Sequence, residues 1–291
     1  MSPNRTTASR PTSGILLLVG AALAFSTAGA FTRVAAIGLW PMVFWRNGFG
    51  CLGLLILLLM RGRVGTVDPR RFSGRAWAAM AGSAFATVCY LAAFGRTSVA
   101  NVSIIYATAP MIAAVLAWIT LRERPRPRTL AAAAVALAGA AVTVGGSAST
   151  DATAGDGLAL LMTLALSGVA VLARGSVLPP LETALGSAGL AAAAVLPIAL
   201  VRSESLGVSP DQALWLALFG FVTMSVALPA YLAGASRVPA GRSMLISSVE
   251  MPFAPLWVWL AFGEMPSPAA LVGGALVLGA LAIDAPGQGR T

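Results

Sequence analysis

Long apolar runs joined by short connections dominate this chain of 291 residues. A transmembrane helix needs about 20 mostly apolar residues, because each residue rises about 1.5 Å and the hydrocarbon core is about 30 Å thick. Ten runs of that kind are found, and they are residues 14–35, 40–60, 76–95, 99–121, 128–146, 157–178, 183–202, 211–234, 241–262 and 268–285. The runs are continuously apolar rather than alternating, which favours helices over a barrel. The sequence therefore predicts an all-α integral membrane protein with ten transmembrane helices.

The composition excludes most other classes of protein. Charged residues make up 10% of the chain, against about 25% in an ordinary soluble domain. The chain has no lysine and no histidine, so it lacks the lysine of a phosphate-binding loop, the histidine of a Ser/His/Asp triad and imidazole ligands for a metal. We therefore expect no enzyme activity, no cofactor and no metal site. An intramembrane lipid-modifying enzyme is the rival from that class, and Glu250 would be its only deep general base.

All 19 basic residues are arginines, and their placement predicts the orientation of the chain. Most lie before the first run, in segments 61–75 and 122–128, or near the C-terminus, whereas the segment around 147–156 has none. Short cytoplasmic loops carry the excess of positive charge in membrane proteins. We expect a protein of the bacterial inner membrane with both termini cytoplasmic. The arginines then lie at the surfaces of the lipid bilayer, and no nucleic-acid partner is expected.

The second half of the chain repeats the first at a shift of about 141 to 143 residues. The segment from Tyr90 to Arg96 matches the segment from Tyr231 to Arg237, and Gly14 matches Gly157 at the start of each half. Each half has five runs, an odd number, so the two halves would insert with opposite topology, as in many secondary transporters. The expected organisation is a cytoplasmic N-terminus (1–13), a first five-helix repeat (14–146), a periplasmic linker (147–156), an inverted second repeat (157–285) and a cytoplasmic C-terminus (286–291).

A proline, a tryptophan-containing apolar stretch and a Glu-x-Pro sequence follow one another in each half. In the first half these are Pro110, Trp118 and residues 123–125; in the second half they are Glu250 to Pro252, Trp257, Trp259 and residues 263–266. The pattern resembles the EamA-type repeat of the drug/metabolite transporter superfamily. One departure is Met251, which stands where that family usually has the proline after the glutamate.

The resemblance implies a transporter of small metabolites, amino acids among them. Ser26 and Thr27 followed by Arg33 are similar to the bacterial aromatic amino-acid exporters within the superfamily. The expected function is therefore export of small metabolites, and most of all amino acids, by alternating access. A multidrug or nucleotide-sugar carrier is the alternative within transport. The small residues of spans 128–146 and 268–285 could also form the face of a homodimer.

Glu250 is the only carboxylate deep within a predicted span. Such groups usually face a cavity or a partner because a charge in the bilayer core is unfavourable. Ser243, Ser247 and Glu250 follow at helical spacing, which predicts one polar face. Glu250 either lines a substrate path on this face or pairs with an arginine such as Arg46 or Arg174.

Arg46 lies about 9 Å into its span at about 1.5 Å per residue. It either binds a substrate carboxylate or extends its guanidinium to the interface. Ser103, Tyr106 and Pro110 share a face that the repeat pairs with Ser247. The expected substrate-binding residues are Ser26, Thr27, Arg46, Tyr90, Ser103, Tyr106, Ser243, Ser247 and Glu250, and Pro110 and Pro252 are the expected helix kinks.

Overall fold

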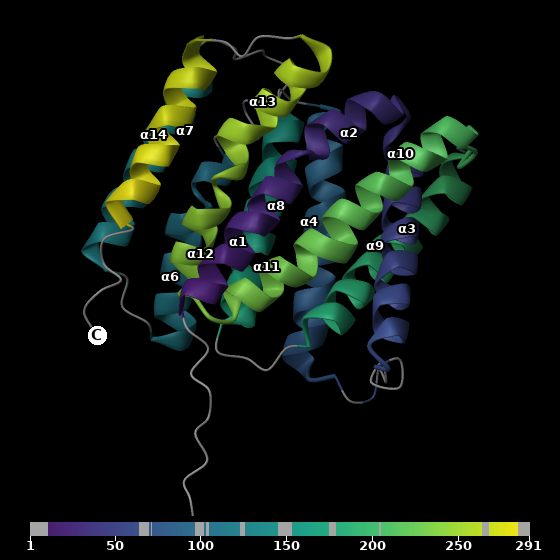
Figure 1. The fold of residues 1–291 in the computed structure, drawn as a ribbon, viewed down its shortest axis with the longest axis horizontal. Coiled ribbons are helices and arrows are strands. Elements are labelled where there is room, and N and C mark those ends of the chain that lie inside the picture. The colour runs from purple at the N-terminus through teal and green to yellow at the C-terminus, as the bar shows by residue number, and fades with distance from the viewer. Residues whose placement is uncertain are drawn as a thin grey trace, which may run out of the picture.

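The computed structural model describes residues 11–63, 70, 72–96, 102, 105–122, 126–144, 153–174, 179–203, 205–263 and 268–284. Every regular element within these ranges is a helix, which confirms the all-α prediction (Figure 1). The helices are α1 (Pro11–Ser26), α2 (Ala28–Ala35), α3 (Leu39–Met60), α4 (Gly74–Phe94), α6 (Ala109–Leu121), α7 (Pro127–Val144), α8 (Thr153–Ala173), α9 (Pro180–Arg202), α10 (Pro210–Gly220), η4 (Phe221–Ala227), α11 (Leu228–Ala235), α12 (Ala240–Ser247), α13 (Glu250–Phe262) and α14 (Pro268–Asp284).

Seven helical stretches in the described residues are long and apolar enough to cross a membrane. This confirms a multi-pass membrane protein. The other three predicted spans are represented by α6, α7 and α14, which are outside that set of seven. The helix α8 begins at Thr153, so the predicted linker 147–156 extends too far into it, and α8 also ends at Ala173 rather than at 178.

Several predicted spans are interrupted near their middle. The first span is divided at Thr27 into α1 and α2, and the ninth is divided at residues 248–249 into α12 and α13. A turn at Thr108 precedes α6, and the eighth span contains the π-helix η4 between α10 and α11. The interruptions divide spans that the sequence predicted as continuous helices.

Pro110 and Pro252 both lie in the first turn of a new helical segment. Pro110 is the second residue of α6, and Pro252 is the third residue of α13. The first turn of a helix has no internal acceptors for its N–H groups, so a proline is tolerated there without loss of a hydrogen bond. Each proline therefore lies just after an interruption of its predicted span, and its role as a helix kink stays a prediction.

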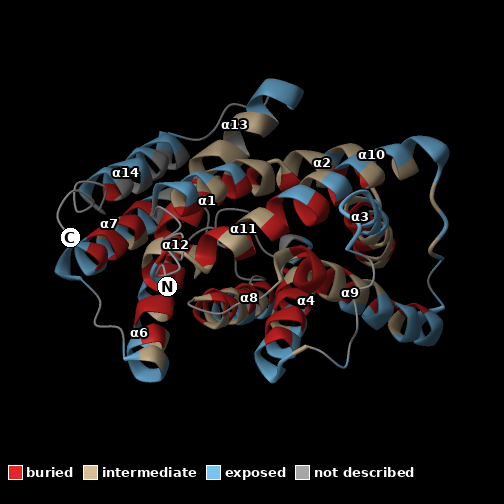
Figure 2. Cartoon of the chain, turned by 60° about the horizontal axis from the view of Figure 1, so that its bottom comes forward, coloured by how far each residue is buried: buried red, intermediate tan, exposed pale blue. Residues whose placement is uncertain are grey.

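The helices pack into one bundle with a peripheral pair. The helix α4 packs against α8 and α9, α3 against α9 and α10, and α1 against α11 and α12. The pair α7 and α14 pack mainly against each other at one edge of the molecule (Figure 1). Buried residues gather on the inward faces of the helices, while exposed residues gather at helix ends and on outer faces (Figure 2). This leaves the centre of the bundle for the site described next.

Candidate functional site

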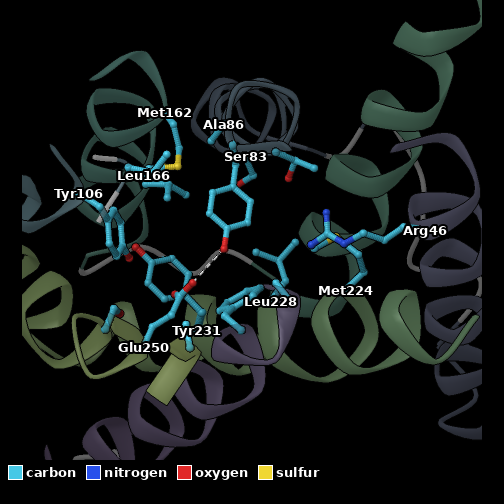
Figure 3. A pocket seen from close by; sticks show the side chains of 17 residues that line it. Arg46, Ser83, Ala86, Tyr106, Met162, Leu166, Met224, Leu228, Tyr231 and Glu250 are labelled. Atoms are coloured by element: carbon cyan, nitrogen blue, oxygen red, sulfur yellow. Dashed lines mark hydrogen bonds between the residues drawn. The ribbon is translucent and has the colours of Figure 1, made fainter. Parts of the chain in front are cut away.

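A cavity of about 110 Å³ lies in the bundle, with a lining drawn from α3, α4, α8, η4, α11, α12 and α13 and from neighbouring segments. A single water needs about 10–15 Å³ of such space, so the cavity can hold a solute of several heavy atoms. Most of its lining is apolar, including Phe25, Met162 and Leu228. The polar groups gather at two places, which Figure 3 shows at opposite ends of the cavity: Glu250 at one and Arg46 at the other.

The Glu250 end is built from a carboxylate and tyrosines. Glu250 is the first residue of α13, directly after the break that separates this helix from α12, and its Oε1 accepts a hydrogen bond from the Tyr90 hydroxyl at 3.3 Å. Tyr106 and Tyr231 lie beside Glu250 in Figure 3. These three tyrosines are the only ones in the chain, and all line this cavity. Aromatic faces and a carboxylate together suit an ammonium group.

The Arg46 end is built on α3 and η4. Arg46 is only 3% exposed. Its Nε donates a hydrogen bond to Thr223 Oγ1 at 3.2 Å, and its guanidinium carbon lies 4.4 Å from the centre of the Phe219 ring. The Thr223 hydroxyl in turn donates to the Phe219 carbonyl at 2.7 Å. The arginine is therefore held by Phe219 at the end of α10 and by Thr223 in the π-helix η4, and π-helical turns often occur at functional sites.

Glycines bring α3 and the α10–η4 segment into close contact below Arg46. A side chain at Gly220 would collide with the Arg46 carbonyl, and one at Gly50 would collide with the Met224 side chain. Ser225 Oγ donates a hydrogen bond to the Gly50 carbonyl at 3.0 Å across the same contact. Only glycine permits backbones this close. The position of Arg46 is thus determined by backbone packing as well as by its side-chain contacts.

The structure brings together part of the predicted site. The predicted residues that line the cavity are Arg46, Tyr90, Tyr106, Ser247 and Glu250. Ser103 lies outside the described residues. The lining does not include Ser26, Thr27 or Ser243.

These three hydroxyls are used in packing instead. Ser26 Oγ accepts a hydrogen bond from Trp257 Nε1 at 2.7 Å, and Thr27 donates to the Ala24 carbonyl. Ser243 is fully buried and donates to the Val238 carbonyl. Of the polar face predicted from Ser243 to Glu250, Ser247 and Glu250 line the cavity and Ser243 does not, and a turn at residues 248–249 separates Ser247 from Glu250.

The structure distinguishes between the alternatives for Glu250, which lines a path or pairs with an arginine, and for Arg46, which binds a ligand or extends to the interface. Glu250 has no arginine within ion-pair distance among the described residues, and its hydrogen bond comes from Tyr90. Arg46 is buried against the Phe219 ring and does not extend to the surface. The pairing alternative for Glu250 and the interfacial alternative for Arg46 are therefore not what the structure shows.

Four polar residues of the site were missed by sequence reasoning. Ser83 and Thr87 line the cavity from α4, Thr223 holds Arg46, and Tyr231 lines the cavity from α11. The repeat could have identified Tyr231, since it matches Tyr90 in the first half. No sequence pattern marks Ser83 or Thr223, because each is a small hydroxyl among apolar residues.

The arrangement presents one cationic and one acidic side chain across an apolar space. No group of three or more acidic, histidine or cysteine side chains that could hold a metal occurs in the described ranges. The chemistry available is reversible binding of a small solute with opposite charges or polar groups at its two ends.

The chain is similar to known proteins over most of its length. A family model described as the EamA-like transporter family matches residues 12–145 and again residues 153–283. A solved structure titled "Crystal structure of protein" has a TM-score of 0.82 at 21% identity, and the match covers 96% of this chain and 98% of that chain. That likeness shows a shared fold. No curated protein matches the chain.

Proposed function

Because the chain belongs to the EamA-like transporter family of the drug/metabolite transporter superfamily, we propose that it exports small amphipathic metabolites, most of all amino acids. The single observation that carries the substrate class is the cavity with Arg46 and Glu250 at its two ends. An amino acid offers a carboxylate to the arginine and an ammonium group to the carboxylate and tyrosines. The apolar lining between them suits an apolar side chain.

The proposed mechanism is alternating access between two inverted five-helix repeats. The two separate matches of one family model support a duplicated chain. Tyr90 and Tyr231, which the repeat makes equivalent, line one cavity, and Pro110 and Pro252 each begin a helix after a break. Inverted repeats of broken helices around a central site are typical of secondary transporters. We place both termini on the cytoplasmic side of a bacterial inner membrane, as the arginine distribution favours.

A carrier of cationic drugs is the second candidate. The tyrosines and Glu250 favour it, since they would also hold an organic cation. Arg46 in the same cavity disfavours it, because a cation without an acidic group meets like charge there. A nucleotide-sugar carrier has less support, since a diphosphate calls for several cations and Arg46 is the only one in the described lining. No observation in the described residues supports the hypothesis of an intramembrane lipid-modifying enzyme.

Counterflow in proteoliposomes tests the proposal. Vesicles containing the purified protein are loaded with one unlabelled solute, and uptake of a labelled solute is followed with and without a pH gradient. The panel contains labelled amino acids, nucleosides and cationic drugs. We expect uptake of amino acids, with other amino acids competing. Competition by cationic drugs together with none by amino acids would reassign the protein to the second candidate.

A further inference from the structure

Arg46 has no acidic group within ion-pair distance among the described residues. Its contacts are the Thr223 hydroxyl and the Phe219 ring, and its Nη1 has no hydrogen-bond partner in that part of the chain. Glu250 lines the same cavity but is not within ion-pair distance. A buried charge is unfavourable unless an opposite charge and hydrogen bonds replace its water. The arginine therefore has room for an anion at close range, which a bound solute could supply.

A second polar atom in the same lining lacks a partner. Ser83 on α4 is 3% exposed, and its Oγ has no hydrogen-bond partner among the described residues. A serine hydroxyl can donate or accept, and rotation about one side-chain torsion redirects it. Buried polar groups in native proteins are almost always paired, so an unpaired one calls for an explanation. Ser83 and Arg46 enter the cavity wall from two helices, α4 and α3.

We propose that Arg46 and Ser83 form the subsite for the carboxylate of the transported solute, an inference that rests on the proposed transport function. A guanidinium fork matches the two oxygens of a carboxylate, and the serine hydroxyl can donate to one of them. The contacts of Nε with Thr223 and of the guanidinium with Phe219 leave the Nη1 side of the fork for this ligand. The solute then lies with its carboxylate at Arg46 and its amino group toward Glu250.

The subsite predicts rejection of solutes that lack the acidic group. A neutral amide cannot neutralise Arg46, and an amine brings no acceptor to it. A site built for an ionic hydrogen bond discriminates strongly against analogues that leave its buried groups unpaired. Ser83 is then a residue that determines specificity, although its own sequence context shows nothing unusual.

Competition in the counterflow assay tests the subsite. The probe is labelled L-leucine, and the competitors are unlabelled leucine, leucine amide and isoamylamine, which differ only in the acidic group. In the wild-type protein we expect leucine to compete at least about tenfold better than either analogue, as expected for hydrogen bonds to charged groups. Ser83→Ala should weaken competition by leucine several-fold and leave competition by the amide unchanged. Arg46→Lys, which keeps the charge and loses the fork, should also reduce the preference.

A matched control removes a different buried hydroxyl. Thr163 on α8 is fully buried, its Oγ1 donates within its own helix to the Ala159 carbonyl, and it is not part of the cavity lining. Thr163→Val should therefore keep the wild-type preference for the acid. All variants are compared by the elution profile of the purified protein, and if Arg46→Lys does not fold, Ser83→Ala decides the matter.

The outcomes separate this inference from the proposed function. Leucine uptake with equal competition by leucine and leucine amide would overturn the carboxylate subsite while transport itself stood. An unchanged preference in Ser83→Ala would remove Ser83 from the subsite. Absence of counterflow for every solute in the panel would overturn the proposed function and this inference together.

Discussion

The two ends of the cavity are built on different kinds of backbone. Arg46 lies in the uninterrupted helix α3, which is held against the α10–η4 segment by glycine contacts and by the bond from Ser225 to Gly50. Glu250 lies at the first residue of α13, directly after a break. The neighbouring elements α1–α2 and α6 are likewise interrupted, at Thr27 and at Thr108.

This difference indicates which wall could move. Conformational changes in packed proteins are concentrated at a few residues between rigid elements, where the backbone torsions can change. The breaks at Thr27, Thr108 and residues 248–249 supply such positions in the spans on the Glu250 side, whereas the Arg46 wall, although it includes the π-helix η4, is held by close glycine packing. We therefore expect the solute to be held at Arg46 by a fixed wall while the Glu250 wall rearranges.

Overpacking of the fixed wall is expected to have the largest effect. Gly220→Ala would place a methyl group against the Arg46 carbonyl and the Gly50 nitrogen, both of which are backbone atoms. Insertion of one methyl group into a packed interior lowers the free energy of unfolding by about 1–3 kcal/mol, and here it should displace Arg46 as well. The measurement is the thermal unfolding midpoint in detergent together with counterflow.

The control for this substitution is Gly48 on α3, which does not take part in the close contact. A Cβ added at Gly48 would meet no atom of another element within 4 Å. Gly48→Ala should leave the midpoint unchanged or raise it, because alanine favours helix by up to about 1 kcal/mol. Equal thermal unfolding midpoints for Gly220→Ala and Gly48→Ala would contradict the view that close packing holds the Arg46 wall in place.

Removal of the acidic charge at the other end should abolish most transport without unfolding the protein. Glu250→Gln keeps the size of the side chain and an oxygen that can accept from Tyr90, but it cannot attract an ammonium group. Counterflow of amino acids should fall at least about tenfold, as expected for loss of a charged interaction. Asp211→Asn, at an exposed position in the first turn of α10, is the matched control and should transport normally. Full counterflow by Glu250→Gln would show that the two ends are not complementary.

The hydroxyl of Tyr90 should contribute more to substrate binding than that of Tyr231, its counterpart in the repeat. The Tyr90 hydroxyl donates to the Glu250 carboxylate, whereas that of Tyr231 donates to the sulfur of Met244, a weak acceptor. Tyr90→Phe should raise the KM for counterflow several-fold because a hydrogen bond to a charged group is lost. Tyr231→Phe should raise it by a smaller factor. A larger increase in KM for Tyr231→Phe than for Tyr90→Phe would contradict the view that the bond from Tyr90 to Glu250 is the more important of the two.

The sequence predicts the fold here better than the site. Ten apolar runs and a repeated pattern are signals spread over many residues, and they lead to an all-helical membrane protein of the correct family. The charged residues Arg46 and Glu250 could also be found, because a deep charge stands out in an apolar run. Both line the cavity.

The small hydroxyl residues could not be assigned in this way. Ser243 lies at helical spacing from Glu250, but it is outside the cavity lining and its hydroxyl donates to the Val238 carbonyl. Ser83 and Thr223 belong to the site because of how α4 and η4 pack around the cavity, which is a tertiary feature. Serine and threonine in membrane helices can bond to their own backbone, so their type alone does not tell which of them face a cavity.

The smallest expected effect concerns the bond that joins two interrupted spans. Trp257 Nε1 on α13 donates to Ser26 Oγ at the end of α1. The bond exists only while α1 and α13 are adjacent, so it stabilises the present arrangement of the movable wall. Ser26→Ala and Trp257→Phe should each lower the free energy of unfolding, and a double-mutant cycle should give a coupling of about 0.5–1.5 kcal/mol.

Thr27, one residue further along, provides the matched control for this cycle. Its hydroxyl bonds locally to the Ala24 carbonyl and so does not depend on where α13 lies. Thr27→Ala combined with Trp257→Phe should therefore give additive effects on the free energy of unfolding. If Ser26 and Trp257 were also additive, the bond would not couple the two spans, and the movable wall would have to be held in its present position by packing alone. A coupling confined to the Ser26 pair would instead identify a contact that must break each time this wall rearranges.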